Sequence, residues 1–318
     1  MGDSKVAAVF GGNGFIGQYV VQQLALAGYT VRVASRRPDQ GALLRPLGRL
    51  GQVAPFYASV LDDASVACVV RGADVVVNLV AVLSPSGRQT LKAVNVEGAG
   101  RVARLAAQAG VGRFIHMSAL GASVTATSAY ARSRAEGEAQ VQQYRPDAAI
   151  IRPSVVFGPE DNFFNLFAML ARYLPALPVY GARTRVQPVY AGDVARVVAA
   201  LAQQDGSVAR VWSLGGPSVM TMADIATLVL EETRKDKSLF HVPGWLARLQ
   251  ATVLERLPGA LLTHDALRLL ATDNVLPSGE TGFESFGLTP RTVQSCVPFY
   301  LERYRAGGGR SGIVVGEL

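Results

Sequence analysis

The amino-acid sequence predicts an α/β protein with a doubly wound parallel sheet and a smaller, mainly helical C-terminal lobe. Two observations carry this prediction. Short apolar runs alternate with helical stretches through the first half of the chain, and a glycine-rich turn directly follows the first run. Continuous apolar runs such as Val75 to Val77 suit strands that are buried on both faces of a parallel sheet. Strands that alternate with helices are typical of right-handed βαβ units.

The elements follow from this alternation. We expect strands over residues 5–10, 30–34, 52–57, 74–80, 112–117 and 148–152, and helices over 14–27, 39–48, 62–71, 88–109 and 129–144. After Pro153 the alternation ends. There we expect helices over 161–173, 193–203, 222–234, 244–256, 263–271 and 290–304, a loop over 173–178 and a strand over 211–214. The aromatic residues of the first of these helices are interpreted as core.

The turn after the first strand has the spacing of a phosphate-binding loop. Gly11, Gly14 and Gly17 follow the pattern G-x-x-G-x-x-G between an apolar strand and a helix. Missing Cβ atoms let backbone N–H groups approach a pyrophosphate, and a helix N-terminus favours negative charge. We prefer a dinucleotide site to a plain glycine turn, because the strand and helix supply the context the motif needs. A Rossmann-type sheet is therefore expected, with cofactor contacts from Gly11, Gly14, Phe15, Ile16 and Gly17.

The end of the second strand distinguishes between two nicotinamide cofactors. A carboxylate there usually binds the ribose hydroxyls of NAD. This chain has Ser35, Arg36 and Arg37 instead, and its first carboxylate is Asp39. A guanidinium forms strong, charge-assisted contacts with a phosphate. We favour NADP(H) over NAD(H), with Arg36 ahead of Arg37 as the partner of the 2′-phosphate and Ser35 as a hydroxyl donor. Two solvated arginines are the alternative.

Composition narrows the class of protein further. Of the 318 residues, 49% are hydrophobic and 17% charged, as in folded globular proteins. The net charge is +7, but the arginines are scattered, so we expect a generally basic surface and no nucleic-acid partner. Cys68, Cys296 and the three histidines fit no metal or redox spacing. We expect no metal, buried free thiols, and a satisfied core position for His116.

The sequence also leads to an expectation about where in the cell the protein lies. The first strand begins within six residues of Met1, and no apolar run is long enough to span a bilayer. We expect a cytoplasmic protein without a signal or transit peptide, or one that lies peripherally on the cytoplasmic face of the inner membrane.

Longer motifs follow several of the expected strands. They are Val9–Gly17, Asn78–Val80, Val94–Gly98, His116–Gly121, Arg152–Asp161, and Gln187–Tyr190 leading to Asp193 and Val194. With them the chain resembles the short-chain dehydrogenase/reductase superfamily in its extended or atypical branch. It looks more closely similar to the nucleotide-binding accessory subunits of respiratory complex I and their bacterial relatives. The resemblance covers about residues 5–305.

The resemblance implies how the cofactor lies along the sheet. Ser59 and Val60 would line the adenine, although relatives often have an Asp in place of Ser59, and here Asp62 and Asp63 come a turn later. The remaining cofactor residues implied are Asn78, Leu79, Val80, Ala81, Asn95, Met117, Ser118, Tyr130, Arg134, Pro153, Ser154, Val155 and Val156.

The expected catalytic group is altered. Active relatives use a Tyr-x-x-x-Lys pair with a Ser or Thr, and this chain has Tyr130 and Arg134. The two residues share one helix face. An arginine keeps the positive charge of the lysine but releases no proton at ordinary pH. The usual Ser-Ser pair reads Ser118-Ala119, so either Ser118 serves or a substitute comes from Ser123, Thr125, Thr127 or Ser128. We therefore rank a structural Tyr130 above a catalytic one.

Two functions remain open. The preferred one is an NADP(H)-binding accessory subunit associated with respiratory complex I, in which the nucleotide stabilises the fold. The alternative is an active NADP-dependent reductase, dehydratase or epimerase of a small molecule. An apolar stripe over residues 245–257 is assigned to helix core packing, ahead of contact with a lipid surface or a partner helix. The expected domains are 1–157 with 187–215 for NADP, 158–186 with 216–305 for substrate or partner, and a flexible tail over 306–318.

Overall fold

The structure is a computed structural model that describes residues 5–206, 208–256, 262–276 and 282–308. The expected tail lies outside the described residues from position 309 onward, as does Leu257 at the end of the apolar stripe. Contacts divide the chain into two compact units. The first comprises Met1–Ser154, Ala191–Gly215 and Leu276–Thr289, and the second comprises Val155–Tyr190, Gly216–Val275 and Pro290–Leu318. The return of the third segment to the first unit had no signal in the sequence.

The first unit is built on a seven-stranded sheet of order β11-β6-β5-β4-β1-β2-β3. Every pairing in it is parallel, which confirms the predicted doubly wound sheet. The strands are β1 Val6–Phe10, β2 Thr30–Ser35, β3 Val53–Tyr57, β4 Val75–Asn78, β5 Arg113–Met117, β6 Ala149–Pro153 and β11 Arg210–Leu214. The strand order reverses between β1 and β4, and open α/β sheets bind ligands at such a switch point.

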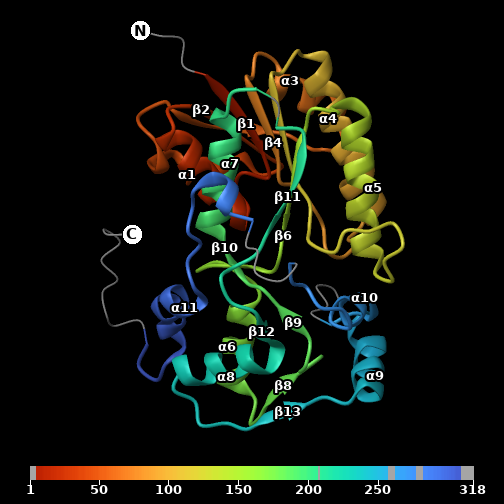
Figure 1. Cartoon of the computed structure of the whole chain (residues 1–318), viewed down its shortest axis with the longest axis vertical. Coiled ribbons are helices and arrows are strands. Elements are labelled where there is room, and N and C mark those ends of the chain that lie inside the picture. The colour runs from red at the N-terminus through yellow and green to blue at the C-terminus, as the bar shows by residue number, and fades with distance from the viewer. Residues whose placement is uncertain (1–4, 207, 257–261, 277–281, 309–318) are drawn as a thin grey trace. The chain divides into compact units, whose positions relative to one another are not determined.

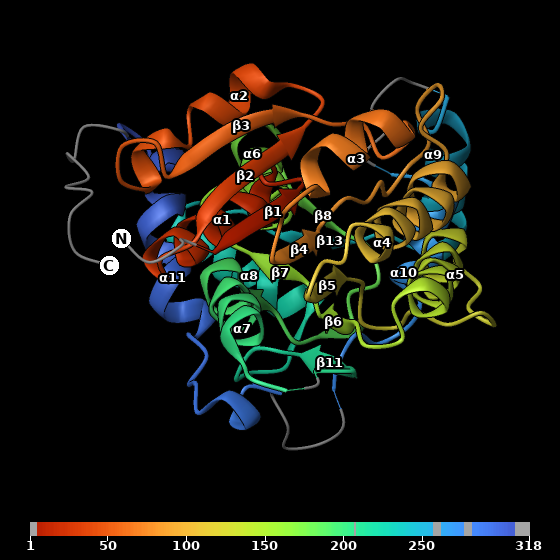
Figure 2. The same ribbon diagram turned by 90° about the horizontal axis from the view of Figure 1, so that it is seen from above.

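Helices cover both faces of this sheet. Helices α1 and α7 pack together on one face, and α3, α4 and α5 lie on the other (Figure 1, Figure 2). The helices of this unit are α1 Phe15–Leu26, α2 Pro38–Ala42, α3 Asp63–Val70, α4 Ala99–Gln108, α5 Ala129–Tyr144 and α7 Ala191–Gln203. The two helical layers bury the central strands, as the apolar run from Val75 to Val77 predicts.

Several local expectations differ from the structure. The helix expected over 39–48 is the short α2 followed by a 3-10 turn, Arg45–Leu47, because Gly41, Pro46 and Gly48 interrupt it. The helix expected over 88–109 starts as a π-helix, Lys92–Gly98, before α4. Such segments are rare and frequently lie at functional sites. Cys68 is exposed and Cys296 half-buried, so the expectation of two buried thiols is wrong.

The second unit mixes helices with short strand pairs. Its helices are α6 Phe164–Tyr173, α8 Met222–Glu232, α9 Gly244–Leu254, α10 His264–Leu269 and α11 Val293–Leu301. Its strands are β7 Val156–Phe157 with β10 Val189–Tyr190, β9 Arg185–Val186 with β12 Met220–Thr221, and β8 Leu177–Val179 with β13 Leu239–His241. The loop expected over 173–178 is therefore partly strand β8. Phe164 and Phe167 lie in the core, as predicted.

Helix α9 presents its large apolar side chains to solvent. It buries the small residues Ala247 and Ala251, while Trp245, Leu249 and Val253 are 68%, 58% and 58% exposed. The preferred expectation of core packing is wrong for these three residues. Their spacing places them on one helix face, but it does not determine whether that face is covered.

Among the residues that the structure describes, no helix has both the length and the apolar character needed to cross a bilayer.

Candidate nucleotide site

The predicted site residues gather at one edge of the sheet of the first unit. Because the strands are parallel, the segments that follow their carboxyl ends meet at that edge. The glycine turn follows β1, Arg36 follows β2, Val60 follows β3, Leu79 follows β4 and Ser118 follows β5. The fold therefore brings together residues that lie more than 100 positions apart in the sequence.

The glycine turn has a backbone that only glycine allows. Gly11 has φ +78°, in the left-handed region, and a Cβ on Gly17 would lie 2.2 Å from the carbonyl oxygen of Gly11. Helix α1 thus starts in direct contact with the turn. Its first turn contains no acidic residue and its N-cap, Gly14, supplies no side-chain bond. The first N–H groups of a helix lack acceptors within the helix. This end of α1 therefore fits a phosphate.

A cavity of about 270 Å³ extends from this turn across the ends of β2 and β3. Nine predicted cofactor residues line it: Gly11, Gly14, Ser35, Arg36, Ser59, Val60, Leu79, Val80 and Ala81. Eight further lining residues were not predicted: Phe10, Asn13, Ala34, Ala58, Leu61, Val82, Gln89 and Val94. Phe10, Ala34 and Ala58 lie at or next to the ends of β1, β2 and β3, where the predicted strands already pointed. The other five lie farther along the connections after β1, β3 and β4, where the sequence gives no local signal.

The cavity carries positive charge at the end of β2. Among the residues that line it, Arg36 alone is charged, and its exposed guanidinium has no ion pair within the described part of the chain. Ser35 shapes the turn that presents Arg36, because its hydroxyl donates to the carbonyl oxygen of Arg37 at 2.9 Å. A second role for Ser35, as a donor to a phosphate, stays a prediction.

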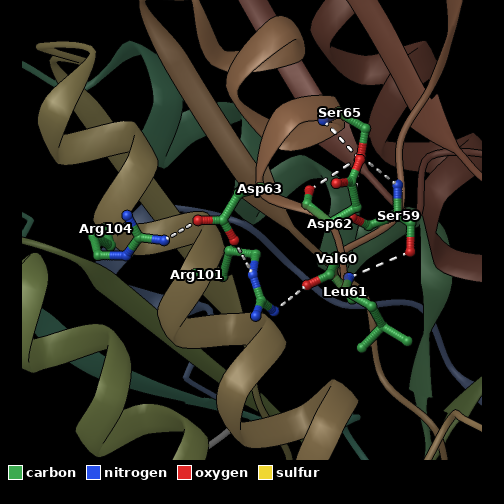
Figure 3. A network of polar contacts seen from close by, with 8 residues as sticks. All are labelled: Ser59, Val60, Leu61, Asp62, Asp63, Ser65, Arg101 and Arg104. Carbon is green, nitrogen blue, oxygen red and sulfur yellow. Dashed lines mark hydrogen bonds and ion pairs between the residues drawn. The ribbon is translucent and has the colours of Figure 1, made fainter.

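A network of polar contacts holds the wall that follows β3 (Figure 3). Asp62 caps α3 by accepting from the backbone N–H of Ser65 at 2.9 Å, and hydrogen bonding by the side chain and then the backbone of Ser65 lowers the pKa of Asp62. The hydroxyl of Ser65 accepts from the backbone N–H of Ser59 at 3.1 Å. The hydroxyl of Ser59 in turn accepts from the N–H of Leu61 at 3.3 Å. The loop is therefore held by its own short polar side chains.

Arginines of α4 complete this network. Asp63 pairs with Arg104 at 2.6 Å and with Arg101 at 2.5 Å, and these two guanidinium groups hold the pKa of Asp63 below its usual range. Arg101 also donates to the carbonyl oxygen of Val60 at 2.6 Å (Figure 3). The carboxylates of Asp62 and Asp63 are thus engaged by Ser65 and by the two arginines. Neither is therefore expected to take the place of the Asp that relatives often have at the position of Ser59.

Two buried asparagines position the loop after β4. The side-chain oxygen of Asn95, on the π-helix, accepts from the N–H of Val82 at 2.9 Å. The amide of Asn95 donates to the carbonyl oxygen of Val82 and to the hydroxyl of Ser133 on α5. Asn78 accepts from the N–H of Val80 at 3.2 Å. Both asparagines therefore fix the wall of the cavity, and direct cofactor contacts from them stay a prediction.

Unpartnered donors gather at the end of β5. Arg134 of α5 is 1% exposed and donates through Nη2 to the carbonyl oxygen of Met117. Its Nε and Nη1, with Nε2 of His116 and Oγ of Ser118, have no hydrogen-bond partner among the described residues. Buried polar groups are almost always hydrogen-bonded. These four atoms are therefore exceptions to that rule among the described residues.

His116 is fully buried, as expected for a core residue, but it is only half satisfied, because its Nε2 has no hydrogen-bond partner among the described residues. Its Nδ1 accepts from the amide of Asn78 at 3.3 Å, which assigns the proton of the neutral ring to the unpartnered Nε2. Burial, and secondarily the charge of Arg134, hold the pKa of His116 well below its usual value. The ring therefore stays neutral and keeps one buried N–H without a partner among the described residues.

The other catalytic candidates differ in whether their hydroxyl groups already have hydrogen-bond partners. Tyr130 is half-buried on α5, one helical turn before Arg134. The hydroxyl of Ser128 caps α5, and Ser123 and Thr125 bond to each other at 3.0 Å. These three hydroxyls are thus occupied locally, unlike that of Ser118. Of the residues expected beside the nicotinamide, Pro153 and Ser154 belong to the first unit, whereas Val155 and Val156 belong to the second.

The parallel sheet, the glycine turn at its switch point and the cavity at the strand ends define a dinucleotide-binding protein of the Rossmann type. Residues 7–215 match the NAD dependent epimerase/dehydratase family, and the chain belongs to this family.

Several named proteins and solved structures are similar to this chain. In Arabidopsis thaliana, the mitochondrial NADH dehydrogenase [ubiquinone] 1 alpha subcomplex subunit 9 is 32% identical over 98% of this chain and 81% of its own length. A ceramide reductase of Caulobacter vibrioides is 32% identical over 60% of this chain and 58% of its own length. Among solved structures, the Bordetella bronchiseptica enzyme WbmG in complex with NAD has a TM-score of 0.71 at 14% identity, over 95% of this chain and 94% of that one. This last similarity concerns the fold alone.

Proposed function

We propose that this protein holds NADP(H) as a resident cofactor and acts as an accessory subunit associated with respiratory complex I. The observation that carries the proposal is the buried Arg134, which stands where active relatives have lysine. Its unpartnered N–H groups, with the Nε2–H of His116 and the hydroxyl of Ser118, would suit the acceptors of a bound nucleotide. An arginine cannot deliver a proton at ordinary pH, so the same group is ill suited to renew a catalytic tyrosine.

The residues at the edge of the sheet would hold the parts of the cofactor in order. The glycine turn and the start of α1 would bind the pyrophosphate, Arg36 the 2′-phosphate, and Val60 the adenine. Arg134 and Ser118 would bind hydroxyl groups toward the nicotinamide end. When bound, NADP(H) supplies a hydride-transferring ring, and the protein supplies orientation and charge.

The choice of NADP(H) over NAD(H) depends on Arg36. We expect Arg36→Gln to weaken NADPH binding about tenfold or more, because a charge-assisted bond to the 2′-phosphate is lost. NADH binding should stay unchanged, since NADH has no such phosphate. Isothermal titration of both cofactors measures the two effects. Arg37→Gln is the matched control, because this neighbouring arginine does not line the cavity. Equal losses for NADPH and NADH in Arg36→Gln would contradict the assignment.

Turnover is the alternative function, and the reductase among the relatives together with the retained Tyr130 favours it. We expect no steady hydride transfer from NADPH to ketones, aldehydes, long-chain acyl ketones or nucleotide sugars. The absorbance of NADPH should therefore stay constant beyond one equivalent. Steady oxidation that disappears in Tyr130→Phe, while NADPH binding persists, would establish a reductase and end the accessory proposal.

The exposed stripe of α9, formed by Trp245, Leu249 and Val253, is the proposed contact with a membrane-bound subunit of complex I. Large apolar side chains on an uncovered helix face are typical of helix-in-groove contacts. The name of the Arabidopsis relative supports this partner. That name also includes the word mitochondrial, so the expected placement on the cytoplasmic face of a membrane stays a prediction.

Substitution of this stripe tests the contact. We expect Trp245→Ser with Leu249→Ser to reduce co-sedimentation with membranes that contain complex I of the source organism, while NADPH binding is unchanged. Leu50→Ser removes another exposed apolar side chain, from the first unit, and should change neither property. Unaltered sedimentation of the double variant would exclude α9 as the contact.

A further inference from the structure

The loop after β3 keeps one backbone donor free on the wall of the cavity. Between Ala58 and Asp62, every N–H group except that of Val60 has an acceptor among the described residues. In chain order these acceptors are the carbonyl oxygen of Ser35, the hydroxyls of Ser65 and Ser59, and the carbonyl oxygen of Ser59. Val60 is 8% exposed and lines the cavity. Buried backbone N–H groups are almost always paired, so this N–H is the donor that a bound nucleotide can engage here.

The peptide groups on both sides of Val60 are held by polar contacts. In the preceding peptide, the carbonyl oxygen of Ser59 accepts from the N–H of Asp62 at 3.0 Å. In the following peptide, the N–H of Leu61 donates to the hydroxyl of Ser59 at 3.3 Å, and the carbonyl oxygen of Val60 accepts from Nη1 of Arg101 at 2.6 Å (Figure 3). Because a peptide group is planar, these contacts also fix the direction of the Val60 backbone. Of the contacts named, that of Arg101 alone comes from outside the loop.

Arg101 is itself held in one orientation. Its side chain lies on α4, is 23% exposed, and donates through Nε to Asp63 at 2.5 Å. The planar fork of a guanidinium can bind two acceptors at once, and here it joins the loop carbonyl of Val60 to the first residue of α3. Arg104 lies one turn further along α4 and pairs with the other oxygen of Asp63, but makes no bond to Val60. The two arginines therefore share a carboxylate and differ in their contact with the loop.

We propose that Arg101 is a positioning residue for the adenine end of the nucleotide, although it does not line the cavity. This inference rests on the proposed NADP(H) site, in which Val60 lies against the adenine. Arg101 acts through the carbonyl of Val60, and so keeps the N–H of Val60 in the direction that an acceptor atom of the base requires. Without Arg101 the following peptide keeps only the neutral bond from Leu61 to Ser59, which is weaker than a charge-assisted one. A nucleotide must then order the loop as it binds, which lowers its affinity.

The test measures dissociation constants of the full chain by isothermal titration with three ligands. They are NADPH, adenosine 2′,5′-bisphosphate, which carries the adenine end alone, and reduced nicotinamide mononucleotide, which carries the other end. Arg101→Gln should weaken the first two by the same factor, about tenfold, because one hydrogen bond from a charged donor is lost. The constant for the mononucleotide should stay as in the wild type. Arg104→Gln is the matched control, and should leave all three constants nearly unchanged.

The outcomes separate this inference from the proposed function. If the wild-type protein binds none of the three ligands, the NADP(H) site itself is wrong and the inference falls with it. If the wild type binds NADPH and Arg101→Gln binds adenosine 2′,5′-bisphosphate just as tightly, the site stands and the positioning role is overturned. An equal loss for the mononucleotide, or an equal loss in Arg104→Gln, would indicate a general structural role and would also overturn it.

Two further measurements decide the matter if Arg101→Gln does not fold by circular dichroism. Adenosine 2′,5′-bisphosphate should slow the amide hydrogen exchange of Val60 in the wild type, followed by NMR, because this N–H gains an acceptor. Arg101→Lys keeps the charge but lacks the fork that joins Val60 to Asp63, so it should retain part of the loss for the two adenine-bearing ligands. Unchanged exchange at Val60, or wild-type affinity in Arg101→Lys, would overturn the inference.

Discussion

Gly17→Ala is expected to abolish tight binding of the nucleotide and to destabilise the fold. The new methyl group would lie 2.2 Å from the backbone oxygen of Gly11 and 2.7 Å from backbone atoms of Gly12. These are main-chain atoms, so the helix start or the turn must move. Overpacking of this kind costs about 1–3 kcal/mol of unfolding free energy. Each amide that leaves the pyrophosphate would cost about a further tenfold in affinity. Urea unfolding and NADPH titration measure the two effects.

A second glycine of the same unit provides the control. Gly112 lies in the connection before β5, and a Cβ there would meet one atom, the carbonyl oxygen of Asp74, at an ordinary 3.6 Å. Gly112→Ala should therefore leave both stability and NADPH binding nearly unchanged. If Gly17→Ala bound NADPH as the wild type does, the glycine turn would not be the pyrophosphate site.

The protein should lose stability as the pH falls below about 6.5, because His116 must stay neutral in the folded state. In the unfolded chain a histidine titrates near pH 6.5, whereas burial and Arg134 hold the folded pKa well below that value. Between these two values the unfolded state binds one more proton. The free energy of unfolding therefore falls by up to about 1.4 kcal/mol for each pH unit, and this loss stops at the folded pKa.

Urea unfolding of the ligand-free protein at pH 7.5, 6.5 and 5.5 measures this loss. His116→Asn replaces the imidazole with a smaller polar side chain that does not titrate. It should remove the change of unfolding free energy between pH 5.5 and 7.5, even if the variant is less stable than the wild type at pH 7.5. His264→Asn is the control, because His264 is far more exposed and pairs with Glu255 at 2.9 Å. Carboxyl groups such as Asp63, whose pKa is lowered in the fold, lose their contribution in a separate and more acidic range. If the pH dependence of the free energy of unfolding were unchanged in His116→Asn, His116 would not be the group that causes it.

Much of the site was readable from sequence because its signals are local. The spacing of Gly11, Gly14 and Gly17 and the arginines after the second strand are patterns within a few residues of one another. The apolar runs predicted the strands of the sheet, and parallel strands bring their carboxyl ends to one edge whatever their order. For this reason the residues after β1, β2, β3 and β4 lie around one cavity, as expected.

The sequence by itself determined the fold class, the glycine turn and the positive end of β2, since each depends on residues that are close along the chain. The tertiary structure alone decided three other features: that Asp63 is committed to Arg101 and Arg104, that Arg134 and His116 keep unpartnered donors, and that α9 exposes its large side chains. Each of these depends on which atoms of distant segments approach one another. Helix period and residue type specify a face, but only packing specifies what covers that face and which buried groups remain without a partner.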